Sequence, residues 1–331
     1  MMFMKKNIFK SLALVCICLG LIACDKKFGE GVKLEGIEVG PDLSLNLGTT
    51  AMTPAYPIPW DNTDYEFAFS SSDPEVATVD AYGKIMAVGT GDATITITCA
   101  GFSKSVNVNV YEITIGQKCQ EIPGLVGLWE FNQPNPLKAT VGADLIAYHH
   151  GRNELGTTEG AENDYAPHPG FNKNDGAIKT VDFNPAFYCK HGLSSGSTYT
   201  ILIDALRPES SGGKYTTLIN TDVTNTGDQV VYWRREGYLQ VDGSANRSSQ
   251  AIQNDKWYRT VIVKNGSSYL RSYVNSVLWK DGGNPSAAVF DATAILLNAD
   301  NDGDDRSLHW STVAIFDRAL TETEIAVLGG L

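Results

Sequence analysis

The sequence predicts an all-β protein built from two successive β-sandwich domains. Its 331 residues include 32 Gly and 13 Pro, many in short clusters that favour turns. Between the clusters, short segments alternate with period two, as in residues 65–69, which is the pattern of half-buried strands. These segments recur about every ten residues, a spacing typical of sandwiches. The length suffices for about two domains with hydrophobic cores of their own.

Composition excludes two classes of protein. Hydrophobic residues make up 43% of the chain and charged residues 19%, so extensive disorder is not expected. The formal charge of −12 argues against a nucleic-acid partner, because binding to phosphates depends on clustered Lys and Arg.

Residues 1–23 have the pattern of a bacterial export signal. A lysine-containing start precedes Ser11–Ala23, an apolar run that is too short for a ~30 Å hydrocarbon core but fits a signal peptide. It ends in Leu21-Ile22-Ala23-Cys24, which resembles the lipobox of bacterial lipoproteins. The resemblance implies cleavage before Cys24, acylation of that residue and attachment to a lipid membrane through several acyl chains. The alternative is an ordinary signal peptide with a chance cysteine. Residues 24–32 are expected to be a tether.

The first domain is expected over residues 33–112, with strands separated by turns rich in Ser, Asp, Pro and Gly. The strand candidates, in order, are Tyr65–Phe69, Val76–Asp80, Lys84–Val88 and Ala93–Thr98. Trp60 lies in a proline-rich insertion and is the aromatic residue of this domain that we most expect to be exposed.

Ser71–Asp80, Gly83–Ile85 and Gly89–Ile95 resemble the group 2 bacterial immunoglobulin-like domain. Phe69 stands where that family often has Trp, and it preserves an aromatic core position. The resemblance implies an immunoglobulin-like β-sandwich that serves as a spacer or adhesive module of a surface protein, without catalysis.

Residues 113–124 are expected to be a linker, and residues 125–331 a second β domain with a short C-terminal helix. Thr321-Glu322-Thr323-Glu324 predicts the start of this helix, because it has the spacing of a capping box, and Gly329-Gly330 predicts its end. The principal strand candidates are Leu125–Asn132, Ala177–Phe183, Thr198–Leu206, Tyr215–Asn220, Gln229–Trp233, Tyr238–Val241, Trp257–Lys264, Ser268–Val274, Ala294–Leu297 and Leu308–Phe316.

This second region resembles the laminin-G-like, concanavalin A-like lectin/glucanase jelly roll. The matching segments include Gly127–Phe131, Trp257–Val261 and Val313–Thr321. The resemblance implies a jelly-roll sandwich of two packed antiparallel sheets, the concave one commonly offering a glycan groove. The combination of modules resembles that of Bacteroidota surface lipoproteins involved in polysaccharide capture.

No catalytic motif is evident in the sequence. Glucanases of this superfamily carry Glu-x-Asp-x-x-Glu or a close variant on one strand, where period two places the carboxylates on one face. The chain contains no Glu-x-Asp-x-x-Glu, because Glu162-Asn163-Asp164 is followed by Pro167 at the position of the second Glu. Gly192-Leu193-Ser194-Ser195-Gly196 has the spacing of a Gly-x-Ser-x-Gly nucleophile elbow, but we interpret it as a polar loop. We therefore expect a protein that is not an enzyme.

A calcium ion is the one cofactor that the sequence suggests. Asp300, Asp302 and Asp304 alternate around Gly303, so their oxygens could surround a hard cation. The twelfth position counted from Asp300 is Ser311, so the segment is not an EF-hand loop. The alternative is an acidic, solvated turn.

Glycan binding requires aromatic rings bracketed by polar groups. The ligand-binding candidates are Tyr232, Trp233, Arg234, Arg235, Tyr238 and Trp279. Tyr232 and Trp233 are consecutive, so one of them should face the core and the other should face outward.

Three further cysteines, Cys99, Cys119 and Cys189, are either buried thiols or include a Cys99–Cys119 disulfide.

The sequence thus predicts a non-catalytic, lipid-anchored protein of the cell envelope that binds a polysaccharide or another surface ligand. The expected location is the outer membrane. The acidic export tag of related surface lipoproteins is replaced here by Asp25-Lys26-Lys27, so the cell surface and the periplasmic face both stay open. The alternatives are an adhesive or structural protein without a sugar site and a divergent glycoside hydrolase.

Overall fold

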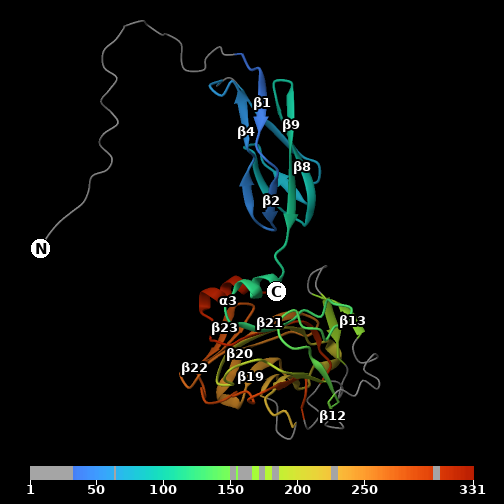
Figure 1. The fold of residues 1–331 in the computed structure, drawn as a ribbon, viewed down its shortest axis with the longest axis vertical. Helices are drawn as coiled ribbons and strands as arrows, with labels where there is room; N and C mark the ends of the chain where they lie inside the picture. Colours follow the sequence, from blue (N-terminus) through green and yellow to red (C-terminus); the bar gives the residue numbers. More distant parts are fainter. Residues whose placement is uncertain are drawn as a thin grey trace, which may run out of the picture. The chain divides into compact units, whose positions relative to one another are not determined.

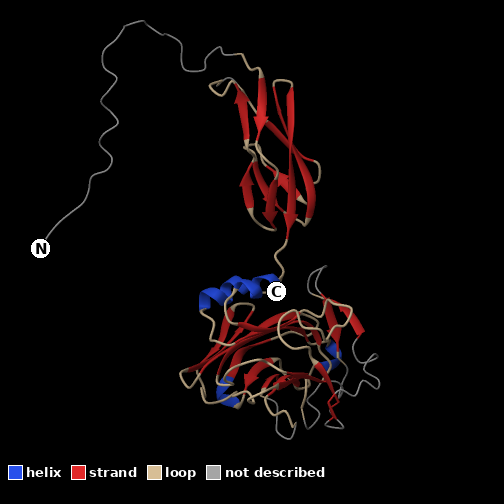
Figure 2. Cartoon of the chain, in the orientation of Figure 1, coloured by secondary structure: helices blue, strands red, loops and turns tan. Residues whose placement is uncertain are grey.

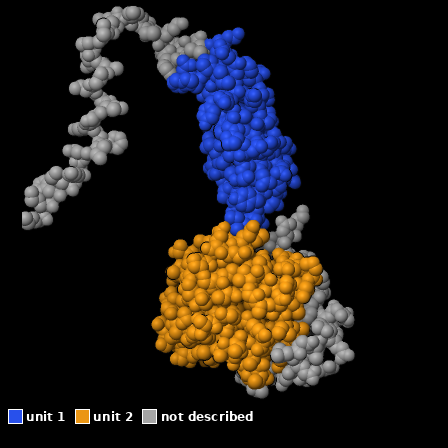
Figure 3. Space-filling view, viewed as in Figure 1, with its two compact units in different colours: residues 1–113 blue, residues 114–331 orange. Residues whose placement is uncertain are grey.

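The computed structural model describes residues 33–62, 65–149, 154–155, 166–170, 176–180, 186–224, 230–300 and 306–331. The chain divides into two compact units between Ile113 and Thr114 (Figure 3). Both units consist mainly of β-strands, as the sequence predicts. Among the described residues, no helix has the length and apolar character that crossing a membrane requires.

The first unit contains nine described strands. They are β1 (Gly36–Val39), β2 (Leu43–Asn46), β3 (Thr50–Met52), β4 (Ala55–Ile58), β5 (Ala68–Ser71), β6 (Ala77–Val79), β7 (Lys84–Ala87), β8 (Gly91–Cys99) and β9 (Phe102–Tyr111).

The strands of the first unit enclose one core. They form sheets in the orders β1-β4, β2-β9-β8-β5 and β3-β7-β6, with β2 and β9 parallel and every other pair antiparallel. The long strand β8 shows why they pack: Ala93, Ile95 and Ile97 alternate with threonines and lie buried. Phe69 packs against the same core, whereas Trp60 is 77% exposed, as expected.

The second unit contains the remaining elements. Its helices are α1 (Ile115–Glu121) and α3 (Glu322–Leu328), with 3₁₀ turns η2 (Glu209–Ser211) and η3 (Ser244–Asn246). Its strands are β10 (Leu125–Trp129), β11 (Ile146–His149), β12 (Glu154–Leu155), β13 (Ala166–Pro169), β14 (Gly176–Lys179), β15 (Ala186–Cys189), β16 (Thr198–Leu206), β17 (Thr216–Asn220), β18 (Val231–Trp233), β19 (Tyr238–Val241), β20 (Arg247–Ala251), β21 (Trp257–Asn265), β22 (Tyr269–Val274), β23 (Val277–Asp281), β24 (Ile295–Leu297) and β25 (His309–Phe316).

Two antiparallel sheets face each other in this unit (Figure 1). One sheet has the order β13-β14-β25-β16-β21-β22-β23, with β10 also paired to β25. Helices α1 and α3 lie on its outer side, as Figure 2 shows, and we call it the helix-side sheet. The other has the order β12-β11-β15-β24-β17-β18-β19-β20, and we call it the opposite sheet.

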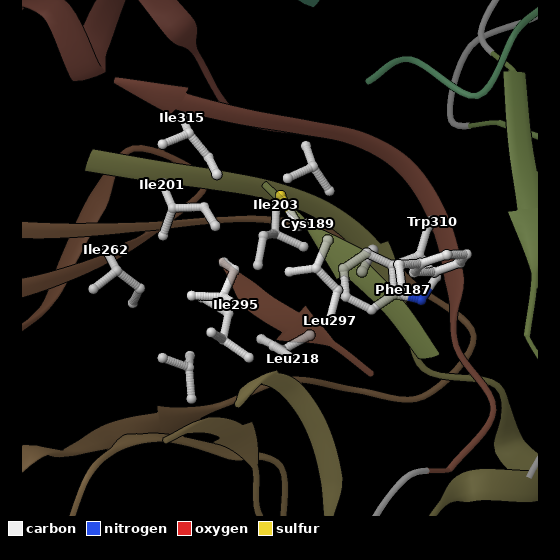
Figure 4. Packing of buried hydrophobic residues seen from close by; sticks show 14 of the residues in the cluster. Phe187, Cys189, Ile201, Ile203, Leu218, Ile262, Ile295, Leu297, Trp310 and Ile315 are labelled. Atoms are coloured by element: carbon white, nitrogen blue, oxygen red, sulfur yellow. The ribbon is translucent and has the colours of Figure 1, made fainter. Parts of the chain in front are cut away.

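The main core fills the space between the two sheets (Figure 4). Ile201, Ile203 and Ile315 point inward from the helix-side sheet, and Leu218 and Leu297 point inward from the opposite sheet. Burying each such side chain contributes roughly 1.5–3 kcal/mol, so this layer holds the sandwich together.

A second, smaller core lies between the helix-side sheet and the two helices. Leu202 and Val263 point outward from the sheet and meet Ile325 and Leu328 of α3. The predicted capping box of α3 is present in full, since Thr321 and Glu324 cap each other's backbone amides.

The expected linker at residues 113–124 instead contains helix α1. Thr114 and Gln117 form a second capping box, and the buried Cys119 joins the smaller core. Residues 114–124 are therefore part of the second unit. Packing against α3 and β10 stabilises this helix of seven residues, which would be too short to persist alone.

All three described cysteines, Cys99, Cys119 and Cys189, are free and buried, so the Cys99–Cys119 disulfide does not form. Burial raises the pKa of Cys119 to about 12, and it also raises the pKa of Cys189.

Candidate functional site

Strand alternation brings several polar and aromatic side chains to the outer face of the opposite sheet. In β18, Val231 and Trp233 belong to the core, so Tyr232 between them points outward and is half-buried. In β19, Leu239 and Val241 belong to the core, so Gln240 points outward. These two outward residues are direct cross-strand partners.

A second tyrosine stands beside Tyr232. Tyr215 immediately precedes β17, in which Thr216 pairs with Trp233 and Thr217 pairs with Tyr232. The rings of Tyr215 and Tyr232 meet edge to face, with their centroids 5.9 Å apart. Such a pair is worth about 0.5–1.5 kcal/mol beyond the area it buries, so each ring holds the other in place.

Two arginines of the β18–β19 hairpin lie over the Tyr215 ring. The guanidinium carbons of Arg234 and Arg235 are 5.5 Å and 4.9 Å from its centroid. Arg234 also donates from Nη1 to Oε1 of Gln240 at 2.9 Å, and its Nε lies 3.4 Å from Oε2 of Glu236. The Arg235 side chain has no hydrogen bond or ion pair to any residue that the structure describes.

One strand further on, another arginine lies over a tyrosine ring. Arg247 of β20 lies 5.7 Å over the ring of Tyr238, which is half-buried at the start of β19. Its guanidinium likewise makes no hydrogen bond or ion pair within the described residues. We call the whole set the tyrosine–arginine cluster: Tyr215, Tyr232, Arg234, Arg235, Tyr238, Gln240 and Arg247.

Buried contacts hold the β18–β19 hairpin, which carries most of the cluster, in place. Arg207, which directly follows β16, is buried and donates from Nη1 to the carbonyl oxygen of Arg234 at 2.8 Å and from Nε to Oδ1 of Asn254 at 2.7 Å. Burial lowers the pKa of Arg207. Gly237 closes the turn at a φ of +88°, where a Cβ would also lie 2.5 Å from the carbonyl oxygen of Ile252. The hairpin is therefore held in one conformation.

Tyrosines and a carboxylate lie at another part of the outer face. Tyr148 of β11 is buried with Leu296 and the half-buried Tyr188. Burial raises the pKa of Tyr148, and the nearby charge of Asp222 raises it further. Asp222 is fixed by bonds that its Oδ1 accepts from the backbone and hydroxyl of Thr224.

The structure brings together four of the six predicted ligand-binding residues: Tyr232, Arg234, Arg235 and Tyr238. Two others lie elsewhere. Trp233 is completely buried in the core, so the prediction that its ring meets a ligand at the surface is wrong. Trp279 lies on β23 of the helix-side sheet and packs against the main core.

Sequence reasoning missed Tyr215, Gln240 and Arg247. Gln240 could have been predicted, because side chains two residues apart on a strand face the same way and Gln240 therefore shares the orientation of Tyr238. Tyr215 and Arg247 become neighbours of the hairpin only through the pairing of β17 with β18 and of β19 with β20.

The suggested calcium site is only partly described. Asp300 is buried, and Asp302 and Asp304 lie outside the described residues. The base of this segment is tied by Asn298, which donates from Nδ2 to the carbonyl oxygen of Arg306 at 3.0 Å. No group of three or more His, Cys, Asp or Glu suited to a metal occurs among the described residues. Cys24, the expected lipidation site, also lies outside them.

Comparison with known proteins defines the class of the first unit. Residues 34–110 match the family model of the Bacterial Ig-like domain (group 2), which confirms the resemblance inferred from the sequence. The chain thus contains an immunoglobulin-like module followed by a second β-sandwich unit.

Curated relatives match parts of this chain. Lacto-N-biosidase of Bifidobacterium bifidum is 41% identical over 113 residues, which cover 34% of this chain and 9% of that protein. The 3-O-alpha-D-galactosyl-alpha-L-arabinofuranosidase of Bifidobacterium longum subsp. longum is 34% identical over 98 residues, covering 29% and 8%. The chain therefore matches less than a tenth of the length of either enzyme.

Solved structures show weaker likeness. Domain 4 of AbnA, a GH43 extracellular arabinanase from Geobacillus stearothermophilus in complex with arabinotriose, aligns with a TM-score of 0.46 and 16% identity, over 62% of this chain and 98% of that chain. The botulinum neurotoxin serotype D binding domain gives 0.45 and 14%, over 64% and 52%. TM-scores below 0.5 do not by themselves establish a common fold.

Proposed function

We propose that the second unit is a glycan-binding domain and that the tyrosine–arginine cluster is its binding surface. The observation that carries the proposal is the gathering of half-buried tyrosine rings and polar side chains on one outer sheet face. Tyrosine rings offer apolar faces to sugar C–H groups, while the guanidinium groups offer hydrogen bonds to hydroxyls. Gln240 is buried, and its Oε1 accepts from Arg234 and so positions that guanidinium. A buried or purely aliphatic face would have favoured the structural alternative.

The names of the curated relatives support a role with glycans. Both are named as enzymes that act on glycosidic bonds, although this chain matches only a small part of each. A module attached to such enzymes can act by holding a polysaccharide instead of cleaving it.

We propose that this chain itself is not an enzyme. The absence of Glu-x-Asp-x-x-Glu from the sequence supports this, since retaining hydrolysis needs two carboxylates about 5 Å apart. A divergent hydrolase is tested by incubating the protein with each glycan that it binds and measuring released reducing sugar. Release above that of the heat-denatured protein would establish the hydrolase instead.

The proposed location is the bacterial outer membrane, with the lipid on Cys24 as anchor. In this arrangement the immunoglobulin-like module is a spacer between the anchor and the binding domain. Metabolic labelling with a fatty acid should modify the wild-type chain and not Cys24→Ala. Labelling that persists in the variant would contradict the proposal.

The binding proposal is tested with a polysaccharide screen by affinity electrophoresis. The chain from residue 25 onward, which keeps both units, should be retarded by at least one glycan, and Tyr232→Ala should weaken that binding about tenfold or more. Tyr82→Ala is the matched control, because Tyr82 is 85% exposed in the first unit and should leave binding unchanged. Absence of binding across the screen, or equal loss in both variants, would refute the assignment.

A further inference from the structure

The arginines of the cluster point to a charged ligand. Three guanidinium groups, those of Arg234, Arg235 and Arg247, gather on one sheet face, and one of them, that of Arg234, is paired with the carboxylate of Glu236. This local excess of positive charge occurs in a chain whose formal net charge is −12. The fold does not require this positive charge, because the guanidinium groups of Arg235 and Arg247 make no hydrogen bond or ion pair within the described residues.

Arg235 and Arg247 are exposed, and each is oriented without being neutralised. The Arg235 guanidinium lies 4.9 Å from the centroid of Tyr215, and that of Arg247 lies 5.7 Å from the centroid of Tyr238. Stacking on a ring restricts the rotamers of a long side chain but leaves the N–H donors at the guanidinium edge available. Each side chain therefore presents a planar set of donors beside an aromatic ring.

A planar set of donors matches a carboxylate, which it can bind through two parallel N–H···O bonds. A ring beside it matches the apolar face of the sugar that carries the carboxylate. We propose, on the basis of the glycan-binding function above, that the ligand class is a polysaccharide containing uronic acids, with Arg235 and Arg247 as the residues that bind its carboxylates.

The charge pattern favours uronic acids over densely sulfated glycans. Each donor group lies over a different tyrosine ring, and Glu236 lies near them. The pKa of Glu236 is lowered first by a backbone hydrogen bond, then by Arg234, and also by the charge of Arg247. A ligand with more than one charge on each sugar would be repelled more strongly by Glu236 and by the acidic chain as a whole. About one charge per sugar fits two separate guanidinium groups, each with its own ring.

The test uses the chain from residue 25 onward and four defined probes: polygalacturonate, its fully methyl-esterified form, neutral arabinan and dextran sulfate. Polygalacturonate and its ester share one backbone and differ in charge, so calorimetric titration of the pair isolates the carboxylate. We expect binding to polygalacturonate that weakens as NaCl rises, and binding to the ester that is at least about tenfold weaker.

The variants assign the charge effect to residues. Arg235→Gln with Arg247→Gln should lower affinity for polygalacturonate about tenfold or more. The control, Lys84→Gln with Lys104→Gln, makes the same change in net charge at exposed positions of the first unit and should leave affinity unchanged. Because all four side chains are exposed, we expect the variants to fold, and thermal unfolding checks this.

The outcomes separate the two proposals. Equal binding of acid and ester, tightest binding to arabinan, or no effect of the arginine variants would overturn the uronic-acid inference and leave glycan binding standing. Tightest binding to dextran sulfate, which carries sulfates and no carboxylates, would overturn the choice of carboxylate. A protein that binds none of the four probes and no glycan in the wider screen would overturn both proposals.

Discussion

The buried ion pair between Asp204 and Arg259 gives the sharpest test of what holds α3 in place. The two residues are direct partners on β16 and β21 and lie beneath the helix. Arg259 donates from Nε and Nη2 to the two carboxylate oxygens of Asp204 at 2.8 Å and 2.6 Å. Its Nη1 donates to the carbonyl oxygen of Leu328, the last residue of α3. One guanidinium thus joins two strands to the helix end.

We predict that Arg259→Leu is much more damaging than removal of both charges. The Asp204 and Arg259 side chains are only 3% and 5% exposed, so the single variant leaves a buried carboxylate without its guanidinium. That situation typically costs about 3–5 kcal/mol in the free energy of unfolding. The double variant Asp204→Leu/Arg259→Leu leaves no charge and loses mainly the bond to the helix carbonyl, about 1–2 kcal/mol.

Urea unfolding followed by tryptophan fluorescence measures these free energies. Five of the six tryptophans lie in the second unit, since Trp60 is the tryptophan of the first, so the signal reports chiefly on the unit under test. Arg271→Leu is the matched control: Arg271 also reaches α3, through Glu322 at 3.4 Å, but its pair is exposed and should contribute less than about 1 kcal/mol.

Labelling of Cys119 gives a second, local readout. This thiol is buried in the smaller core and its pKa is raised to about 12, so it should resist labelling at pH 8 until α3 moves. In the chain from residue 25 onward, with Cys99 and Cys189 replaced so that Cys119 is the one remaining cysteine, Arg259→Leu should speed its labelling. The reasoning is refuted if the single and double variants unfold at the same urea concentration, or if Arg259→Leu behaves like Arg271→Leu.

Three further predictions concern other parts of the second unit. Arg318 holds the pKa of Glu324 at about 2, down from 4.5, so the pair should stabilise the chain by about 1 kcal/mol above pH 4.5 and lose this stabilisation as the pH falls toward 2. The difference in unfolding free energy between wild type and Glu324→Gln should therefore shrink to nothing over that pH range. A difference that does not change with pH would contradict this prediction. Gly196→Ala should lower the free energy of unfolding in urea by several kcal/mol, because the new Cβ would collide with the backbone carbonyl of Phe290. Gly213→Ala should lower it by about 1 kcal/mol, because that position has open space and only the strain of a φ of +69°. Equal losses of stability in the two variants would contradict the packing argument. If the turn at Asp300–Asp305 binds calcium, millimolar Ca²⁺ should raise the melting temperature and its chelation by EDTA should reverse this, whereas no shift would favour the solvated turn.

Much of the fold could be predicted because its causes are local. Thr198–Leu206 and Tyr238–Val241 have the same bounds as strands β16 and β19, and the capping box at Thr321 starts α3 as expected. Alternation, turn residues and caps act over a few residues, so they can be recognised in the sequence without knowing which segments pack together in the fold. Helix α1 was missed although its own capping box was present, because its seven residues depend on packing against α3.

The candidate site was predicted only in part. Period two established that Tyr232 and Trp233 must face opposite ways, yet it could not say which of them faces out, since both are aromatic. The position of the second sheet decided this by burying Trp233. The sequence also predicts Trp279 as a ligand-binding residue, but strand order places it on the other sheet.

The sequence by itself determined that this chain is rich in strands, that its first unit is immunoglobulin-like and that its last helix begins at Thr321. Only the tertiary structure decided which distant residues meet: Tyr215 with Arg235, Tyr238 with Arg247, and Asp204 with Arg259. The reason is physical. A strand fixes the direction of its own side chains through its backbone, whereas its neighbours depend on which strands pair and in which register, and that is set by burial of the whole core.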